Sequence, residues 1–173
     1  MSLVELHGRT MGSLVSPRPG PHGARMNHCC EEDLVSTLLD QIQAPTAPWD
    51  IASVGTEFDY RRGRADVVAV SRDGIVVAFE AKMDRWKVAL WQAYRNTCFA
   101  HRSYVVLPSE RAHSAHRRGA EFERLGVGLC SVEEEGIVIL VESNAFAPIQ
   151  PWLTEKAVGS TCAGARCDGA ISR

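Results

Sequence analysis

The sequence has no hydrophobic run as long as a membrane-spanning helix, and no secretory signal is visible at its N-terminus. It has no large excess of charge of one sign. The formal net charge of -2 argues against a protein that coats nucleic acid non-specifically, although a local basic surface is compatible with it. A disulfide framework is also lacking, because the six cysteines are not spaced as in small secreted domains. These absences favour a reducing, cytoplasmic compartment and no membrane partner.

What is present suffices for one folded domain. The chain has 173 residues, and 45% of them are hydrophobic, which is enough for a real core. Periodic hydrophobic patterns are confined to residues 29–156, which we expect to form a single domain. Residues 1–28 are rich in Gly, Pro and Ser, and residues 157–173 hold scattered Gly, Ala and Cys. We expect both segments to be disordered tails.

Two apolar runs joined by a short turn are the most informative stretch. Residues 64–70 and 75–82 have the composition of paired strands, with a three-residue turn that ends at Gly74. If Gly74 takes the left-handed conformation, Ser71 lies opposite Ile75, and this fixes the register of the hairpin.

The same register places Asp66 opposite Glu80. Because side chains alternate between the faces of a strand, Asp66, Glu80 and Lys82 are predicted to project to one side. Two carboxylates and one ammonium on an otherwise apolar sheet face are costly unless a cation and a substrate use them. The alternative is structural: Glu80 and Lys82 would then form a solvated strand end, and Asp66 would belong to a turn.

The remaining elements predict the fold class. Helices are expected at residues 31–43, 86–99 and 109–125, the last capped by Ser109 and stopped by Gly126. Further strands are expected at residues 51–58, 103–107, 127–132 and 137–141. The hairpin is apolar on both faces, so helices must cover both. We therefore expect an α/β fold, a three-layer α/β/α sandwich with a mixed sheet and an αβββαβ core.

The Asp66 and Glu80-Ala81-Lys82 pattern resembles the PD-(D/E)xK, or restriction-endonuclease-like, nuclease superfamily. The αβββαβ order is also that superfamily's common core. The Pro that often precedes the first Asp is replaced here by Ala65. The resemblance implies that Asp66 and Glu80 hold a divalent metal, usually magnesium (or manganese), and that Lys82 assists the attacking water and the phosphate. Hard cations prefer such oxygen ligands, and metal-bound water is easier to deprotonate.

Two more residues match positions of this superfamily. Glu31 lies on the apolar face of the first helix, three residues before Leu34, where resolvase-like members carry a further metal-site glutamate. The alternative for Glu31 is that it only favours the positive helix N-terminus. Gln92 lies on the helix after the catalytic strand, where several branches carry a glutamine that reaches the active site. The alternative for Gln92 is a surface position on an amphipathic helix.

Basic residues flank the acids on both sides in the sequence. Arg61, Arg62 and Arg64 precede Asp66, and Arg85 and Lys87 follow Lys82. Both groups are expected at the same end of the sheet as the acids, where a phosphate backbone would approach.

These features predict a metal-dependent nuclease, an endonuclease that hydrolyses phosphodiester bonds in DNA. DNA is preferred to RNA only through the resemblance. A small core with one site often needs a second copy to cut both strands, so a homodimer is possible. The alternative is a non-catalytic module with the same fold that binds nucleic acid or a partner protein. A third class is a metal-independent interaction protein in which the acids serve only structure.

Overall fold

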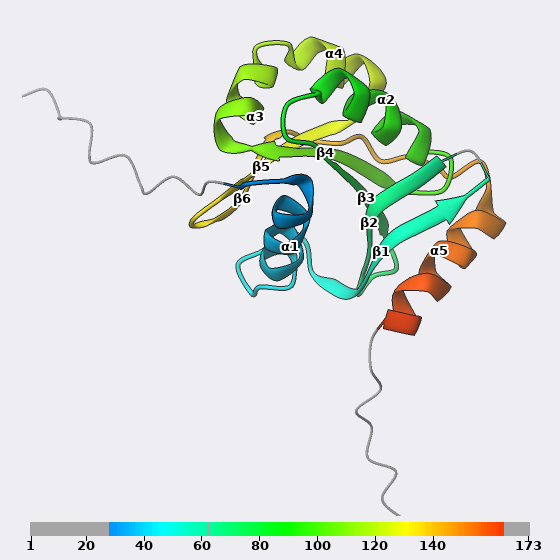
Figure 1. Ribbon diagram of the computed structural model, residues 1–173. Coiled ribbons are helices and arrows are strands. Elements are labelled where there is room, and N and C mark those ends of the chain that lie inside the picture. Colours follow the sequence, from blue (N-terminus) through cyan, green and yellow to red (C-terminus); the bar gives the residue numbers. More distant parts are fainter. Residues whose placement is uncertain (1–27, 62, 165–173) are drawn as a thin grey trace, which may run out of the picture.

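The structure is a computed structural model, and it describes residues 28–61 and 63–164. Its elements are α1 (Glu31–Ile42), β1 (Ile51–Tyr60), β2 (Gly63–Ser71), β3 (Val76–Ala81), α2 (Trp86–Asn96), β4 (Arg102–Pro108), α3 (Ser109–His116), α4 (Gly119–Leu125), β5 (Gly128–Glu133), β6 (Gly136–Val141) and α5 (Pro151–Gly164). The strands form one sheet in the order β1-β2-β3-β4-β5-β6 (Figure 1). The β3–β4 and β4–β5 pairs are parallel and the others antiparallel.

Helices cover both faces of this mixed sheet (Figure 1). The apolar stripe of α1, with Leu34, Leu38 and Ile42, packs on one face against strand residues that include Phe79. Helices α2, α3 and α4 pack on the opposite face, and α5 joins them there over β1 and β2. The expected α/β sandwich with αβββαβ order is confirmed. Among the described helices, none is long and apolar enough to cross a membrane.

The β2–β3 hairpin has the expected register. The Ser71 amide donates to the Ile75 carbonyl at 2.9 Å, and Gly74 has φ +84°, the left-handed conformation that the turn requires. The strand pairing runs to Val67 opposite Phe79, and one more step places Asp66 beside Glu80.

Simple alternation fails at Asp66. Residues an even number of positions apart on a strand should share a face. On β2, however, Ala65 and Val67 pack into cores on opposite faces of the sheet, and on β1 the same is true of Phe58 and Val54. At the same level on β1, Glu57 lies between Thr56 and Phe58, which pair with Val67 and Ala65, and it has φ +53°, a rare conformation for a side-chain-bearing residue. Asp66 therefore lies where β1 and β2 exchange faces, and its side chain is not held to either apolar core.

Several expected bounds differ from the structure: the first strand continues to Tyr60, and the helix expected over residues 86–99 ends at Asn96. The helix expected over residues 109–125 is two helices, α3 and α4. Ser109 does not cap it: the cap position is Pro108, and the Ser109 hydroxyl donates to Glu133 at 3.0 Å. We expected a disordered C-terminal tail from residue 157, and this was wrong for residues 157–164. There α5 continues and buries Ala157 and Thr161. Residues 1–27 and 165–173 lie outside the described residues.

Gly128 gives a test of the core packing around Tyr104. A Cβ at Gly128 would lie 2.2 Å from Cδ1 of Tyr104, a fully buried ring stacked on Phe79. Because that ring has no space to move, we expect Gly128→Ala to destabilise the protein by about 3 kcal/mol, or roughly 5–10 °C in melting temperature. Gly159→Ala is the matched control, since nothing lies within 4 Å of its Cβ position. An equal effect of the two changes in thermal melts would contradict this packing.

Candidate active site

Asp66 is held by the backbone of β3 at the end of the sheet. Its Oδ2 accepts a hydrogen bond from the Ala81 amide at 2.9 Å and lies 3.6 Å from Nζ of Lys82. The side chain is partly exposed, so one carboxylate is fixed in orientation while solvent still reaches it.

Lys82, directly after β3, connects the sheet to helix α1. Its Nζ donates to Oε2 of Glu31 at 2.9 Å and to the Ala81 carbonyl at 2.9 Å. Burial opposes the ammonium charge, but the hydrogen bond to Glu31 and the charges of Asp66 and Glu80 raise the pKa of Lys82 overall. The lysine is therefore a fixed positive charge and not a proton acceptor at neutral pH.

Glu80 is fully buried beneath α2. Its Oε1 accepts a hydrogen bond from Nδ2 of Asn96 at 2.7 Å, whereas its Oε2 is buried without a hydrogen-bond partner among the described residues. Burial first, and the charge of Asp66 second, raise the pKa of Glu80 to about 8. In the absence of a cation, this carboxyl therefore carries a proton through much of the neutral range.

Tyr60 and Asn96 complete this buried network, and the sequence analysis missed both. The Tyr60 hydroxyl donates to Oδ1 of Asn96 at 2.6 Å, which leaves Nδ2 of Asn96 directed at Glu80. Burial chiefly raises the pKa of Tyr60 to about 12, so it remains a donor. One signal pointed to Asn96: it follows Gln92 by four residues and so shares its helix face.

The structure brings Glu31, Asp66 and Lys82 together, with Glu80 close enough for its pKa to respond to Asp66 and Lys82. Gln92 is half-buried, and its Oε1 has no hydrogen-bond partner among the described residues. Among the described residues, no hydrogen bond joins Gln92 to the acids, so its expected role remains a prediction.

Within residues 28–61 and 63–164, no group of three acids, His or Cys has a geometry that could hold a metal ion. Glu31 in particular contacts Lys82. The residues do fit a site with two carboxylates: magnesium typically takes only one or two from the protein. The partnerless Oε2 of Glu80 is an acceptor that such an ion would satisfy.

The flanking basic residues lie near this end of the sheet. Arg61 is exposed in the β1–β2 turn, and Arg64 is 3.3 Å from the Glu57 carboxylate. Arg85 and Lys87 are exposed at the start of α2. Arg62 lies outside the described residues. Their contact with nucleic acid remains a prediction.

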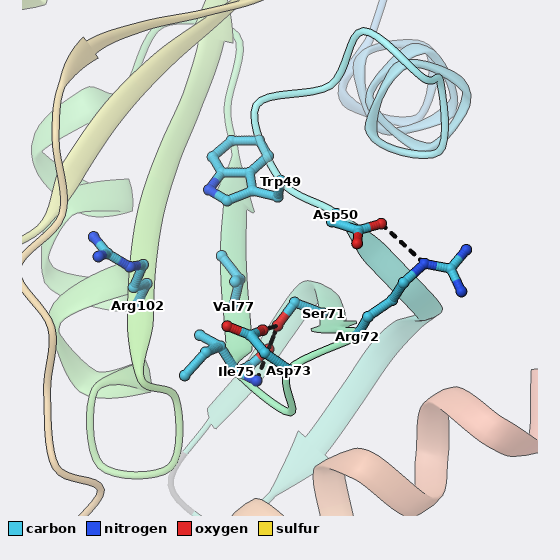
Figure 2. Close-up of a pocket in the computed structure, with 8 residues that line it drawn as sticks. All are labelled: Trp49, Asp50, Ser71, Arg72, Asp73, Ile75, Val77 and Arg102. Atoms are coloured by element: carbon cyan, nitrogen blue, oxygen red, sulfur yellow. Dashed lines mark hydrogen bonds and ion pairs between the residues drawn. The ribbon is translucent and has the colours of Figure 1, made fainter.

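A separate hollow lies at the other end of the hairpin (Figure 2). It has a volume of about 560 Å³ and is lined by Trp49, Asp50, Ser71, Arg72, Asp73, Ile75, Val77 and Arg102. Each charged side chain of the lining has a hydrogen-bond partner: Arg72 donates to Asp50 at 3.0 Å, the Ser71 hydroxyl donates to Asp73, and Arg102 donates at 2.9 Å to Glu142, which is not part of the lining. None of the predicted site residues lines this hollow.

No protein-family model matches the chain, and neither does any curated protein. Among solved structures, it is similar to the SPO1766 protein of unknown function from Silicibacter pomeroyi, with 17% identity, 77% of this chain and 84% of that chain covered, and a TM-score of 0.55. A repair endonuclease from Pyrococcus abyssi overlaps at 19% identity, over 57% of this chain and 46% of that chain, with a TM-score of 0.33. The first similarity is one of fold alone, and the second is too low to indicate a shared fold.

Proposed function

We propose that this protein is a magnesium-dependent nuclease that hydrolyses phosphodiester bonds in DNA. The observation that carries the proposal is the convergence of Asp66, Glu80 and Lys82 at one sheet end, with one carboxylate oxygen of Glu80 buried and partnerless. A buried acid with so high a pKa is typical of a functional site when a second acid and a lysine lie beside it.

Asp66 and Glu80 would hold the metal ion. When bound, that ion supplies an activated water and neutralises charge on the phosphate. The hydrogen bond from Asn96 fixes one oxygen of Glu80, and the Ala81 amide fixes one oxygen of Asp66, so both ligands are oriented before the ion arrives. Lys82 remains protonated and stabilises negative charge on the phosphate.

Glu31 is proposed to position Lys82. Its carboxylate is the partner of Nζ at 2.9 Å, and no three-acid metal group is formed in the described part of the chain. This role differs from the metal ligation that the resemblance implied for Glu31. The positioning role requires only that Glu31 hold the ammonium group of Lys82 toward Asp66.

The basic test is cleavage of supercoiled plasmid by purified protein with Mg²⁺, which should stop in EDTA. Lys82→Met should lower the cleavage rate by at least about 100-fold, because the charge that stabilises the phosphate is lost. Mg²⁺ binding, measured by calorimetry, should persist. Lys156→Met is the matched control, since Lys156 is an exposed lysine on α5. Cleavage by Lys82→Met at the parent rate would rule out this role.

One observation favours the non-catalytic alternative. Glu80 is fully buried and hydrogen-bonded to Asn96, as a purely structural acid would be. A binding module of this kind would retain nucleic acid after Asp66→Ala and would not cut plasmid with any divalent ion. Plasmid and single-stranded DNA that both stay uncut with Mg²⁺ and with Mn²⁺ would select this alternative.

A further inference from the structure

The outer face of α2 exposes large apolar side chains. Val88, Trp91 and Tyr94 are 41%, 54% and 41% exposed, and their spacing of three residues places them along one side of the helix. The rings of Trp91 and Tyr94 meet edge to face, with centroids 5.9 Å apart. The inner side of α2 is meanwhile fully engaged with the sheet through Ala89, Leu90, Ala93 and Asn96. A group of large apolar side chains exposed to solvent side by side indicates a binding surface.

The charge along α2 and at its N-cap has one sign. Arg85, Lys87 and Arg95 are exposed on the same helix or at its cap, and no Asp or Glu occurs from residue 85 to residue 109. Arg95 also lies near the candidate active site, because its charge lowers the pKa values of Glu80 and Tyr60 against their overall rise. One helix thus presents a basic aromatic surface outward and the network of Glu80 inward.

The positive charge of α2 distinguishes between two ligands for its outer face, a second copy of the chain and a polyanion. In a symmetric dimer, the same patch meets itself, so the cations of two copies of α2 would face each other without an acid on either helix. A polyanion with flat apolar groups satisfies both features at once. Single-stranded nucleic acid is such a ligand: its bases stack on aromatic rings and its phosphates bind Arg and Lys.

We propose that Trp91 and Tyr94, with Lys87 and Arg95, form a stacking platform for unpaired bases of DNA. The platform rests on the proposed function in one respect: it identifies the substrate of the neighbouring site as DNA with a single-stranded segment. Strand ends, flaps and loops belong to this class, and uniform duplex does not.

The test measures binding of fluorescent oligo-dT and of a duplex of equal length by anisotropy, in EDTA so that no cutting occurs. Trp91→Ala should weaken oligo-dT binding by about 10- to 100-fold, and Tyr94→Ala should weaken it too. Both should leave duplex binding nearly unchanged. Trp91→Phe should restore most of the affinity. Lys87→Gln with Arg95→Gln should reduce the salt dependence of binding.

Matched controls exist in the same chain. Trp152 on α5 is 61% exposed, so Trp152→Ala removes a similarly accessible indole, and Arg117→Gln removes an exposed guanidinium at the C-cap of α3. Oligo-dT binding that is absent in the parent, or that falls equally in Trp91→Ala and Trp152→Ala, would overturn the platform. So would a parent dimer in sedimentation that Trp91→Ala dissociates, because the face would then be an interface between copies. Tight binding without cleavage in Mg²⁺ would instead overturn the proposed nuclease and leave the platform standing.

Discussion

Asp66→Asn and Glu80→Gln should each lower the rate of plasmid cleavage by at least about 1,000-fold while the protein remains folded. Each change removes one negative charge from the proposed metal pair and nearly preserves shape. The expected loss is large because both the ion and the phosphate depend on these oxygens. Rates should be measured in single-turnover assays over a range of Mg²⁺ concentrations, since a weakened site is partly rescued by more metal.

Asp73→Asn is the matched control for this pair, because Asp73 is an exposed acid on the turn of the same hairpin. It should cut like the parent. Thermal melts must accompany the assays, so that a variant that has unfolded is not counted as inactive. If Asp66→Asn and Glu80→Gln both cut like the parent, the catalytic site lies elsewhere.

Glu80 should also make the metal-free protein less stable as the pH rises from about 5 to 8. Its folded-state pKa is raised to about 8 from an ordinary value of 4.5. The folded state therefore holds a proton that the unfolded state has released above pH 4.5, and this contribution is lost as the pH rises through 8. Glu80→Gln mimics the protonated form, so at pH 8 it should melt roughly 5–10 °C above the parent, which corresponds to about 3 kcal/mol.

The measurement is the melting temperature of parent and variant in EDTA across this pH range. Their difference isolates Glu80, because other groups are common to both, including His101, whose pKa is lowered by burial. Asp40→Asn, an exposed acid on α1, should follow the parent curve. Added Mg²⁺ should restore stability to the parent at pH 8 and not to Glu80→Gln. A parent and variant with parallel curves would contradict the raised pKa of Glu80.

The residues around Asp66 show why part of the site was predictable and part was not. The turn at Gly74 and the alternation of apolar residues determine the hairpin register, and with it the approach of Asp66 to Glu80. These are local interactions within one short stretch of chain. Glu31 was placed toward the sheet by helical spacing alone, and it does contact Lys82 there. That contact joins helix α1 to the end of strand β3, so helical spacing within α1 could not predict that the partner of Glu31 is Lys82.

The sequence by itself determined the order of the elements as far as β6, apart from the division between α3 and α4, and the two apolar faces of the hairpin, because periodicity and turn residues act locally. Only the tertiary structure decided how Asp66 and Glu80 are held. Asp66 lies where β1 and β2 exchange faces, at the level of the left-handed Glu57. Asn96, brought over Glu80 by the packing of α2, holds one oxygen of Glu80. Tertiary packing likewise orders residues 157–164 as part of α5, although their composition indicates no fold, because the sheet offers Ala157 and Thr161 a surface on which to be buried.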